Sequence, residues 1–513
     1  MSALPLALHR AAGVRLGALI CFASIILTGC ALQTHEPRPL DATTSQATYL
    51  ARRPDDTALR EAMSRLGVDT TVWPLAVWDA PELSALALAS HPDLEAARAE
   101  VAVAQAAGRT ARQRANPSLE LTLEHHSAPG QSDSPWTIGV ALDTLVGEWL
   151  LGQSRRAALT DLADAQQLEA VEHAALVAWQ VHRRVRDSHR ALHDAEQSAA
   201  LADETLALQR EESVLWQRRM TLGAAGAPEV LPSQQRQAVA LQQAHQARLA
   251  VEQARAALAQ AIGLPREQMA RMALRFDSLM RTPIEAPENA APGISPEAVL
   301  DPLDLQRAAL LNNVAVRIAL ARYAATDAAL RLEIARQVPE LSLKPGYAWD
   351  QGDHRWSLGI GYALPLLNRN DAPIAEAMAR RAAEAARFDA LQAQAIAELD
   401  AARLVAAAAS ARQAEARQQA QVARTLSERI ARRVEQGDAD RLERITGRRA
   451  ELDARRALAE ARAALGNARA ALEDLVQRPL APVFAALVAP SAGSAAESAA
   501  RLVVIPTATD RTR

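Results

Sequence analysis

The sequence predicts a mainly α-helical protein with two β-hairpins, organised as a duplicated unit of helix, hairpin, very long helix and return helix. Three observations predict this class. Hydrophobic residues make up 49% of the chain and aromatic residues only 3%, a balance that suits closely packed helices better than thick globular cores. Short motifs occur twice in the same order. Neither glycine nor proline interrupts residues 155–222, and a helix of that length indicates a coiled coil.

The charge of the chain excludes one class of partner. There are 57 basic and 60 acidic residues, for a formal charge of -3, and the two kinds are interspersed along the sequence. Because no basic stripe is available to contact phosphates, we expect no nucleic-acid partner.

The first thirty residues are typical of a targeting segment. Arg10 and Arg15 precede an apolar run at 16–27 that is too short for a convincing spanning helix. The run ends in LTGC, which resembles the bacterial lipobox and so implies cleavage before Cys30 and lipidation of its thiol. Cys21 would leave with the signal peptide, so the mature chain would hold no disulfide and no cysteine-based metal site. The alternative is an ordinary cleaved signal with a chance cysteine.

An internal repeat organises the remainder of the chain. WTIGV at 136–140 recurs as WSLGI at 356–360, PSLEL at 117–121 recurs as PELSL at 339–343, and RMTLG at 219–223 recurs as RVEQG at 433–437. In both copies of the third motif a glutamate follows the glycine at the same distance, at Glu229 and Glu443. The shared order indicates duplication.

These motifs and the proline-rich breaks divide the chain. We assign a signal peptide (1–29), a lipid-anchored N-terminal lead (30–80), a first repeat (81–263, with hairpin 117–145 and tip 219–229), an inter-repeat linker (264–302), a second repeat (303–478, with hairpin 339–366 and tip 433–443) and a C-terminal tail (479–513). In the second repeat we expect a long helix at 373–436 and a return helix at 439–476. On the return helix Leu458, Leu465 and Leu472 fall at heptad spacing.

Both hairpins alternate apolar and polar residues, as half-exposed strands do. Much of the scarce aromatic supply lies here, as in the interfacial girdles of membrane barrels: Trp136, Tyr347, Trp349, Trp356 and Tyr362. A soluble hairpin packed on a core gives the same alternation. Single-chain bacterial barrels begin at about eight strands, so membrane insertion of four strands would need several chains to share one barrel.

The motifs together resemble the outer membrane factor family typified by TolC, in its lipoprotein subgroup. The residues that carry the resemblance are HPDL at 91–94, ANPSL at 115–119, ALPLLN at 363–368 and the two Arg-x-x-x-Gly turns. The resemblance covers nearly all of the mature chain. It implies a homotrimer in the outer membrane, with a transmembrane β-barrel shared by three chains and a coiled-coil α-barrel in the periplasm. It also implies docking to a periplasmic adaptor and an inner-membrane pump that expel drugs, metals or other small solutes.

The two turns supply the first candidate site residues. Gly223 and Gly437 lie where long helices must reverse, and glycine there can adopt the left-handed conformation that ends a helix. Arg219 and Arg433, one turn earlier, suit the negative end of the helix dipole. The resemblance adds adaptor docking at these same four residues.

Three acids follow the second turn, namely Asp438, Asp440 and Glu443. The resemblance places them at the narrowest part of the periplasmic entrance, where a ring of carboxylates would favour cations and could be closed by a bound cation or by bridges to arginine. The alternative is that acids commonly begin helices because the dipole favours them there.

The histidines of the first long helix do not predict a metal site. His182, His189 and His193 share a helix, and two of them are at i and i+4 spacing, but no carboxylate or cysteine partner is evident. Solvent-facing histidines are the commoner case. We therefore expect no metal and no cofactor.

The sequence contains no catalytic motif: no Gly-x-Ser-x-Gly elbow, no His-Glu-x-x-His site and no phosphate-binding glycine-rich loop with its lysine. This absence is expected for the passive efflux duct that the resemblance implies, and we predict that the protein is not an enzyme. The alternative function is a lipid-anchored periplasmic coiled-coil tether without a pore. The sequence does not specify the exported solute, because selectivity belongs largely to the pump.

Overall fold

The computed structural model describes residues 34–127, 135–147, 154–277 and 302–477. The predicted signal peptide, Cys30, most of the linker and the tail at 479–513 lie outside the described residues. The chain forms two units, Met1–Ala51 and Arg52–Arg513. In the first, helix α2 (Ala42–Leu50) begins after Asp41, whose Oδ2 accepts a hydrogen bond from the Thr44 amide (2.9 Å), which satisfies one of the free amides of the helix N-terminus.

The second unit is mainly helical. Its described helices are α3 (Thr57–Arg65), α4 (Ala80–Ser90), α5 (Pro92–Ala111), α7 (Ser154–Thr221), α8 (Ala227–Ile262), α9 (Arg266–Met269), α10 (Pro302–Asn312), α11 (Val314–Ala335), α12 (Asp371–Gln436) and α13 (Arg441–Val476). The long helix predicted at 155–222 is confirmed as α7, which has 68 residues. None of the described helices combines the length and the apolar character that a membrane-spanning helix needs.

The second long helix and its return also match their predicted ranges closely. Helix α12 begins at Asp371, ahead of the predicted start at Pro373. Proline is tolerated in the first turn of a helix because its missing amide hydrogen has no partner there. Helix α13 begins at Arg441, because Asp440 caps it by accepting a hydrogen bond from the Leu442 amide.

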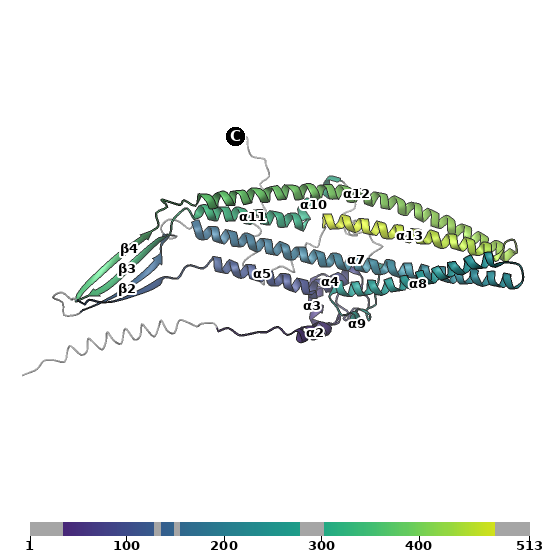
Figure 1. Ribbon diagram of the computed structural model, residues 1–513, viewed down its shortest axis with the longest axis horizontal. Helices are drawn as coiled ribbons and strands as arrows, with labels where there is room; N and C mark the ends of the chain where they lie inside the picture. Colours follow the sequence, from purple (N-terminus) through teal and green to yellow (C-terminus); the bar gives the residue numbers. More distant parts are fainter. Residues whose placement is uncertain (1–33, 128–134, 148–153, 278–301, 478–513) are drawn as a thin grey trace, which may run out of the picture. The chain divides into compact units, whose positions relative to one another are not determined.

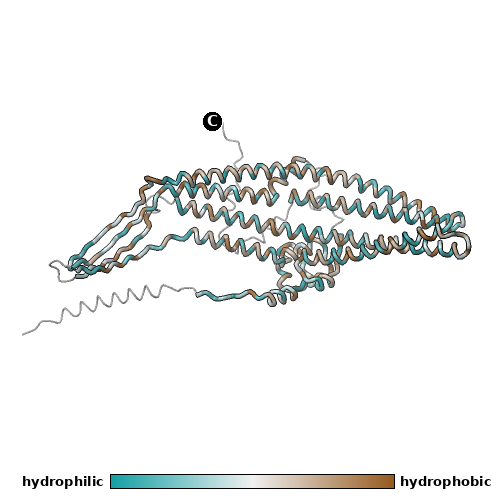
Figure 2. Tube along the Cα trace, viewed as in Figure 1, coloured by the Kyte–Doolittle hydropathy of each residue, from teal (hydrophilic) through white to brown (hydrophobic). Residues whose placement is uncertain are grey.

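The long helices pack in pairs. Helix α7 packs along α8 and α11, while α12 packs along α13 and α11 (Figure 1). The contact between α7 and α8 buries three alanines and one leucine, namely Ala202, Ala240, Ala244 and Leu206. Hydrophobic and hydrophilic residues are interspersed along each helix (Figure 2), as expected for coiled coils with one packed face.

The predicted leucine seam on α13 is largely buried. Leu465 packs with Ala409 and Ala468 against α12, and Leu472 lies in a separate buried cluster. Leu458 is half-buried and lines a groove beside α7. The heptad therefore identifies the packed face of this helix for its C-terminal part.

The two predicted hairpins join into one antiparallel sheet in the order β1-β2-β3-β4. The strands are β1 (Ser118–His125), β2 (Trp136–Leu145), β3 (Leu341–Asp350) and β4 (Asp353–Tyr362). Strand β2 of the first hairpin pairs with β3 of the second, with Ile138 opposite Trp349. Strand β4 ends at Tyr362, so Leu364, which continues the predicted alternation, lies beyond the strand.

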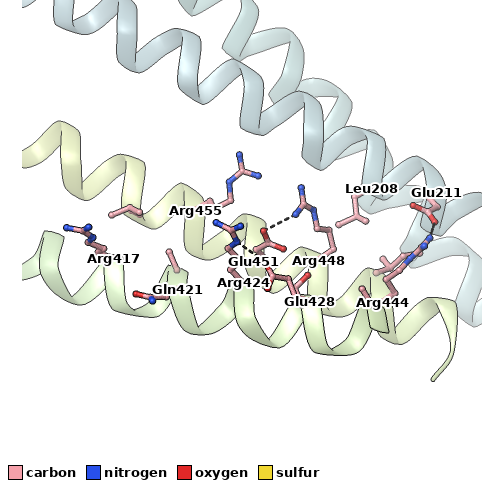
Figure 3. Close-up of a pocket in the computed structure, with 15 residues that line it drawn as sticks. Leu208, Glu211, Arg417, Gln421, Arg424, Glu428, Arg444, Arg448, Glu451 and Arg455 are labelled. Atoms are coloured by element: carbon pink, nitrogen blue, oxygen red, sulfur yellow. Dashed lines mark hydrogen bonds and ion pairs between the residues drawn. The ribbon is translucent and has the colours of Figure 1, made fainter. Parts of the chain in front are cut away.

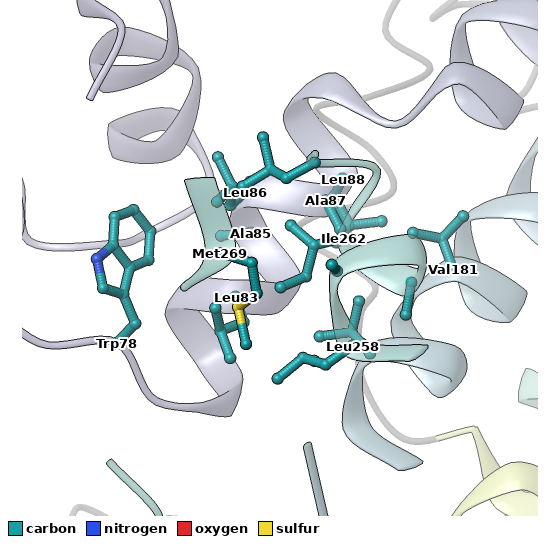
Figure 4. Close-up of a cluster of buried hydrophobic side chains, with 14 of the residues drawn as sticks. Trp78, Leu83, Ala85, Leu86, Ala87, Leu88, Val181, Leu258, Ile262 and Met269 are labelled. Atoms are coloured by element: carbon teal, nitrogen blue, oxygen red, sulfur yellow. The ribbon is translucent and has the colours of Figure 1, made fainter. Parts of the chain in front are cut away.

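The largest buried cluster forms where α3, α4, α7, α8 and α9 meet. Leu83, Leu86, Leu258 and Ile262 lie at its centre (Figure 4). A parallel bridge between Trp78 and Leu274 closes one side. Residues of the predicted lead and linker thus contribute to a core that sequence periodicity did not reveal.

Candidate functional site

The two reversals of the long helices form the candidate site. Gly223 has φ +72° and Gly437 has φ +82°, which is the left-handed conformation that favours glycine. At the second turn the Gly437 amide donates to the Val434 carbonyl (3.2 Å) and the Asp438 amide donates to the Arg433 carbonyl (2.8 Å). This pair of bonds ends a helix, so the predicted capping role of both glycines is confirmed.

The returning helices begin with acidic residues that act as caps. Glu229 Oε2 accepts a hydrogen bond from the Gly226 amide (2.9 Å) at the start of α8, and Asp440 accepts from the Leu442 amide at the start of α13. Capping of helix N-termini therefore accounts for Asp440. It does not account for Glu443, whose side chain reaches back to the preceding helix.

Arginines form ion pairs with two of the acids of the turns. Arg433 Nη1 lies 2.9 Å from Glu443 Oε1, and Arg433 Nη2 donates to the Asp438 carbonyl (3.0 Å). Arg219 Nη2 lies 2.7 Å from Asp440 Oδ2 and so joins the first turn to the second. The hydrogen bonds from Arg219 and from the Leu442 amide lower the pKa of Asp440.

The Arg219 guanidinium has a second neighbour. It lies 5.5 Å from the centroid of the Trp216 ring, a cation–π contact. Trp216 was not predicted as a site residue. Its position on the same face as Arg219, three residues earlier on a helix, is the signal that could have identified it.

Further from the turns, ion pairs join α7 to α13 and flank a groove of about 1080 Å³ (Figure 3). Arg444 Nη2 lies 2.6 Å from Glu211 Oε1. Arg448 Nη2 and Arg455 Nη1 lie 3.0 and 2.6 Å from Glu204 Oε2. These hydrogen bonds, the one from Arg455 foremost, leave the pKa of Glu204 below its ordinary value.

Glu212 connects three helices at this level. Its side chain is only 7% exposed and binds Arg236 of α8 (2.6 Å) and Arg449 of α13. Burial raises the pKa of Glu212, but the two guanidinium groups lower it further, so the pKa lies below that of a free glutamate. Beside it, leucine and isoleucine side chains of α7 and α13 are buried together, namely Leu201, Leu208, Ile445 and Leu452.

A second buried ionic cluster lies where α13 ends against α7. Arg186 is 7% exposed and binds Glu473 Oε2 (2.9 Å) and Asp474 Oδ1 (3.0 Å). Burial raises the pKa of both carboxyl groups. For Glu473 the hydrogen bond from His182 and the charge of Arg186 outweigh burial and lower the pKa, whereas for Asp474 the pKa stays raised. Sequence pattern alone did not show this cluster, because its members are far apart in the chain.

The histidines of α7 correct one expectation. His189 is fully buried and not solvent-facing. Its Nε2 lies 2.9 Å from the Arg275 carbonyl, and its ring stacks on Phe276 with centroids 4.6 Å apart. Burial lowers the pKa of His189. In the part of the chain that the structure describes, no group of histidine, cysteine and carboxylate side chains has the geometry of a metal site.

Comparison with known proteins agrees with this architecture. Residues 83–264 match the family model described as outer membrane efflux protein. The structure is similar to that of the outer-membrane channel OprN, with a TM-score of 0.62 and 19% identity over 87% of this chain and 99% of that one.

Two further solved structures are similar. The outer membrane protein VceC from Vibrio cholerae gives a TM-score of 0.59 and 18% identity over 77% of this chain and 95% of its own. The CmeC outer membrane channel from Campylobacter jejuni gives 0.60 and 13% identity over 87% and 94%. No curated protein matches the chain significantly by sequence.

The structural likenesses show the fold and the family model identifies the domain. The predicted duplicated helix-and-hairpin architecture is confirmed. The matched family is one of channels and not of enzymes. Residues 83–264 thus match the outer membrane efflux protein family that the motifs predicted, and they are set in the fold of outer-membrane channels such as OprN.

Proposed function

We propose that the chain is the outer-membrane channel of a tripartite efflux system, anchored by a lipid on Cys30. As a homotrimer, it would passively conduct small solutes, such as drugs or metal ions, from a periplasmic adaptor and an inner-membrane pump to the exterior. The observation that carries the proposal is the four-stranded sheet, because its apolar face is exposed and its outer strands have open edges.

The apolar face of the sheet has no cover within the described chain. Leu121 is 74% exposed, Ile138 54% and Leu358 65%. Water disfavours so large a patch, and such patches mark sites that contact lipid or protein. Lipid is the environment that suits the face, with the aromatic residues placed as interfacial anchors.

The open edges explain why one chain cannot act alone. Strands β1 and β4 each have one paired side in the four-stranded sheet. An unpaired backbone group in hydrocarbon costs several kcal/mol, so a sheet that enters the membrane must close into a barrel. Three chains contributing four strands each would close one.

A Cys30→Ser variant tests the channel against the tether. It removes the proposed lipid attachment and leaves the sheet unchanged. A barrel should keep the protein in the outer-membrane fraction and trimeric in detergent. A tether that depends on its lipid should instead become a soluble periplasmic protein, and that result would overturn the proposal.

We further propose that the two turns receive the adaptor and surround the periplasmic entrance, with Arg219, Gly223, Arg433 and Gly437 at the docking surface. Asp438, Asp440 and Glu443 would line the constriction. The pairing of Glu443 with Arg433 supports a closed state held by internal bridges. The Asp438 carboxylate makes no ion pair with any other described residue, so it would supply unneutralised charge to a carboxylate ring.

Single-channel conductance in lipid bilayers tests this entrance. Glu443→Ala should change conductance and lower the preference for cations, because it removes a carboxylate and frees Arg433. Glu415→Ala is the matched control, since Glu415 is an exposed glutamate of α12 far from the turns. Unchanged conductance and cation preference in Glu443→Ala would discard the constriction.

A further inference from the structure

The apolar alternation of β4 continues beyond the hydrogen-bonded strand. Strand β4 ends at Tyr362, yet Leu364 and Leu366 continue the same two-residue period. They are 67% and 76% exposed, and the adjacent Leu367 is 103% exposed. Three leucines in one loop are therefore uncovered, directly next to the face that we propose contacts lipid.

The loop is held in place by hydrogen bonds. The Leu366 amide donates to the Leu364 carbonyl (2.8 Å), which makes a tight turn. The Gln337 side chain donates to the Arg369 carbonyl (3.1 Å) and the Asn370 side chain donates to the Glu333 carbonyl (2.7 Å). The loop is thus fastened to the end of α11, and its leucines are exposed in a fixed arrangement.

A cation follows the leucines. The Arg369 side chain is exposed and makes no ion pair with any described residue. The neighbouring Arg336, in contrast, is paired with Glu333. Apolar side chains followed by a free guanidinium have the composition of a segment that lies at a membrane surface, where the apolar groups enter the acyl region and the cation meets phosphate.

We infer that residues 364–369, the leucine loop, are an interfacial anchor in the periplasmic leaflet of the membrane. Leu364, Leu366 and Leu367 would lie among phospholipid acyl chains, and the Arg369 guanidinium would bind a phospholipid phosphate. The inference rests on the proposed membrane barrel. It adds that the lipid-contacting surface extends past the sheet, so the membrane boundary would lie at the start of α12.

Site-directed spin labelling tests the leucine loop. Leu367→Cys is labelled with a nitroxide in the full-length trimer, reconstituted in vesicles of phosphatidylethanolamine and phosphatidylglycerol. Leu367 is fully exposed, so its replacement leaves no cavity. Leu358→Cys in β4 and Leu222→Cys at the first turn are the matched controls, because both are exposed leucines. The protein without an added cysteine gives the background labelling.

The readout is the accessibility of each label to oxygen, which concentrates in lipid, and to a water-soluble nickel chelate. At Leu367 and Leu358 we expect oxygen to relax the label more strongly than the chelate, and at Leu222 the reverse. A label at Leu367 that behaves like the one at Leu222 would overturn the inference. Low accessibility of the Leu367 label to both reagents would also overturn it, because the label would then be covered by protein. If the label at Leu358 also lies in water, the proposed barrel itself fails.

The role of the cation is tested separately. Arg369→Glu in the Leu367→Cys background should reduce the ratio of oxygen to chelate accessibility, because a carboxylate is repelled by lipid phosphate. Arg336→Glu, on a cation that already has an internal partner, is the control. An equal effect of the two substitutions would refute the phosphate contact.

Discussion

Substitution of Glu212 should loosen the junction of α7, α8 and α13 more than substitution of its neighbour Glu211. Both residues are glutamates of α7 that bind an arginine of α13. They differ in burial, since the Glu212 side chain is 7% exposed and the Glu211 side chain 44%. Glu212 also binds a second arginine, Arg236 of α8. Replacing each glutamate with glutamine keeps the size of the side chain and removes its charge, so the comparison measures the combined effect of burial and of the second arginine.

The expected magnitude follows from the contacts. A hydrogen bond to a charged group contributes roughly 1.5–3 kcal/mol, and Glu212 binds two arginines. Those arginine side chains are 41% and 30% exposed, so water would solvate them once Glu212 is neutral. The free energy lost is therefore smaller than the sum of the two hydrogen bonds. We expect about 2 kcal/mol for Glu212→Gln. Both partners of the Glu211–Arg444 pair are exposed, and such pairs contribute about 0.2–1 kcal/mol.

Hydrogen exchange measured by mass spectrometry gives the local opening free energy. Peptides from the adjoining parts of α7, α8 and α13 should exchange roughly 30-fold faster in Glu212→Gln, because each 1.4 kcal/mol is a factor of ten. Glu211→Gln should accelerate them no more than about fivefold. Equal acceleration by the two variants would refute the claim that burial and a second arginine make Glu212 the stronger link.

Two further predictions concern the turns. Gly437→Ala should destabilise the second turn by about 1–2 kcal/mol, because alanine is strained at positive φ. Gly437→Asn should destabilise it less, since asparagine tolerates that conformation. Hydrogen exchange of peptides from 433–445 measures both losses, and equal losses would contradict the conformational explanation. Because the pKa of Asp440 is lowered in the folded state, its pairing with Arg219 should stabilise the turns above the ordinary carboxyl pKa and be lost only as pH falls through the lowered value. The exchange ratio of a 214–222 peptide between Asp440→Asn and the unmodified protein should therefore stay constant from neutral to mildly acidic pH, and a ratio that falls to one near pH 6 would contradict the assignment.

The elements that depend on local pattern could be predicted from the sequence. The uninterrupted run that became α7, the alternation that became the strands and the glycines that reverse the helices each carry their signal within a few residues. Helix α13 begins slightly after its predicted start at residue 439, because Asp440 is its N-cap. Helix capping and hydrophobic periodicity involve residues that are close in the sequence, so these elements can be predicted without knowledge of the fold.

The contacts between distant segments could not be predicted. Arg186 meets Glu473 and Asp474, and His189 is covered by Arg275 and Phe276. In a sequence with so many evenly mixed charges, each arginine has many possible partners, and burial alone decides which pairs matter. The expectation that His189 faces solvent failed because the segment that covers it lies within the predicted linker and shows no periodicity.

The way in which the helix pairs are joined bears on how the proposed entrance could open. The fully buried apolar contact between α7 and α13 extends toward the turns as far as Ile445. Closer to the turns, Leu442 is only partly buried, and the exposed pair of Arg219 and Asp440 joins the two reversals. Separating that pair costs about 0.2–1 kcal/mol, which binding of a partner protein can easily supply. Separating Glu212 from its arginines costs more, so an outward movement of the turns should stop near Glu212, and exchange in an adaptor-bound complex should rise on the turn side of that residue and not beyond it.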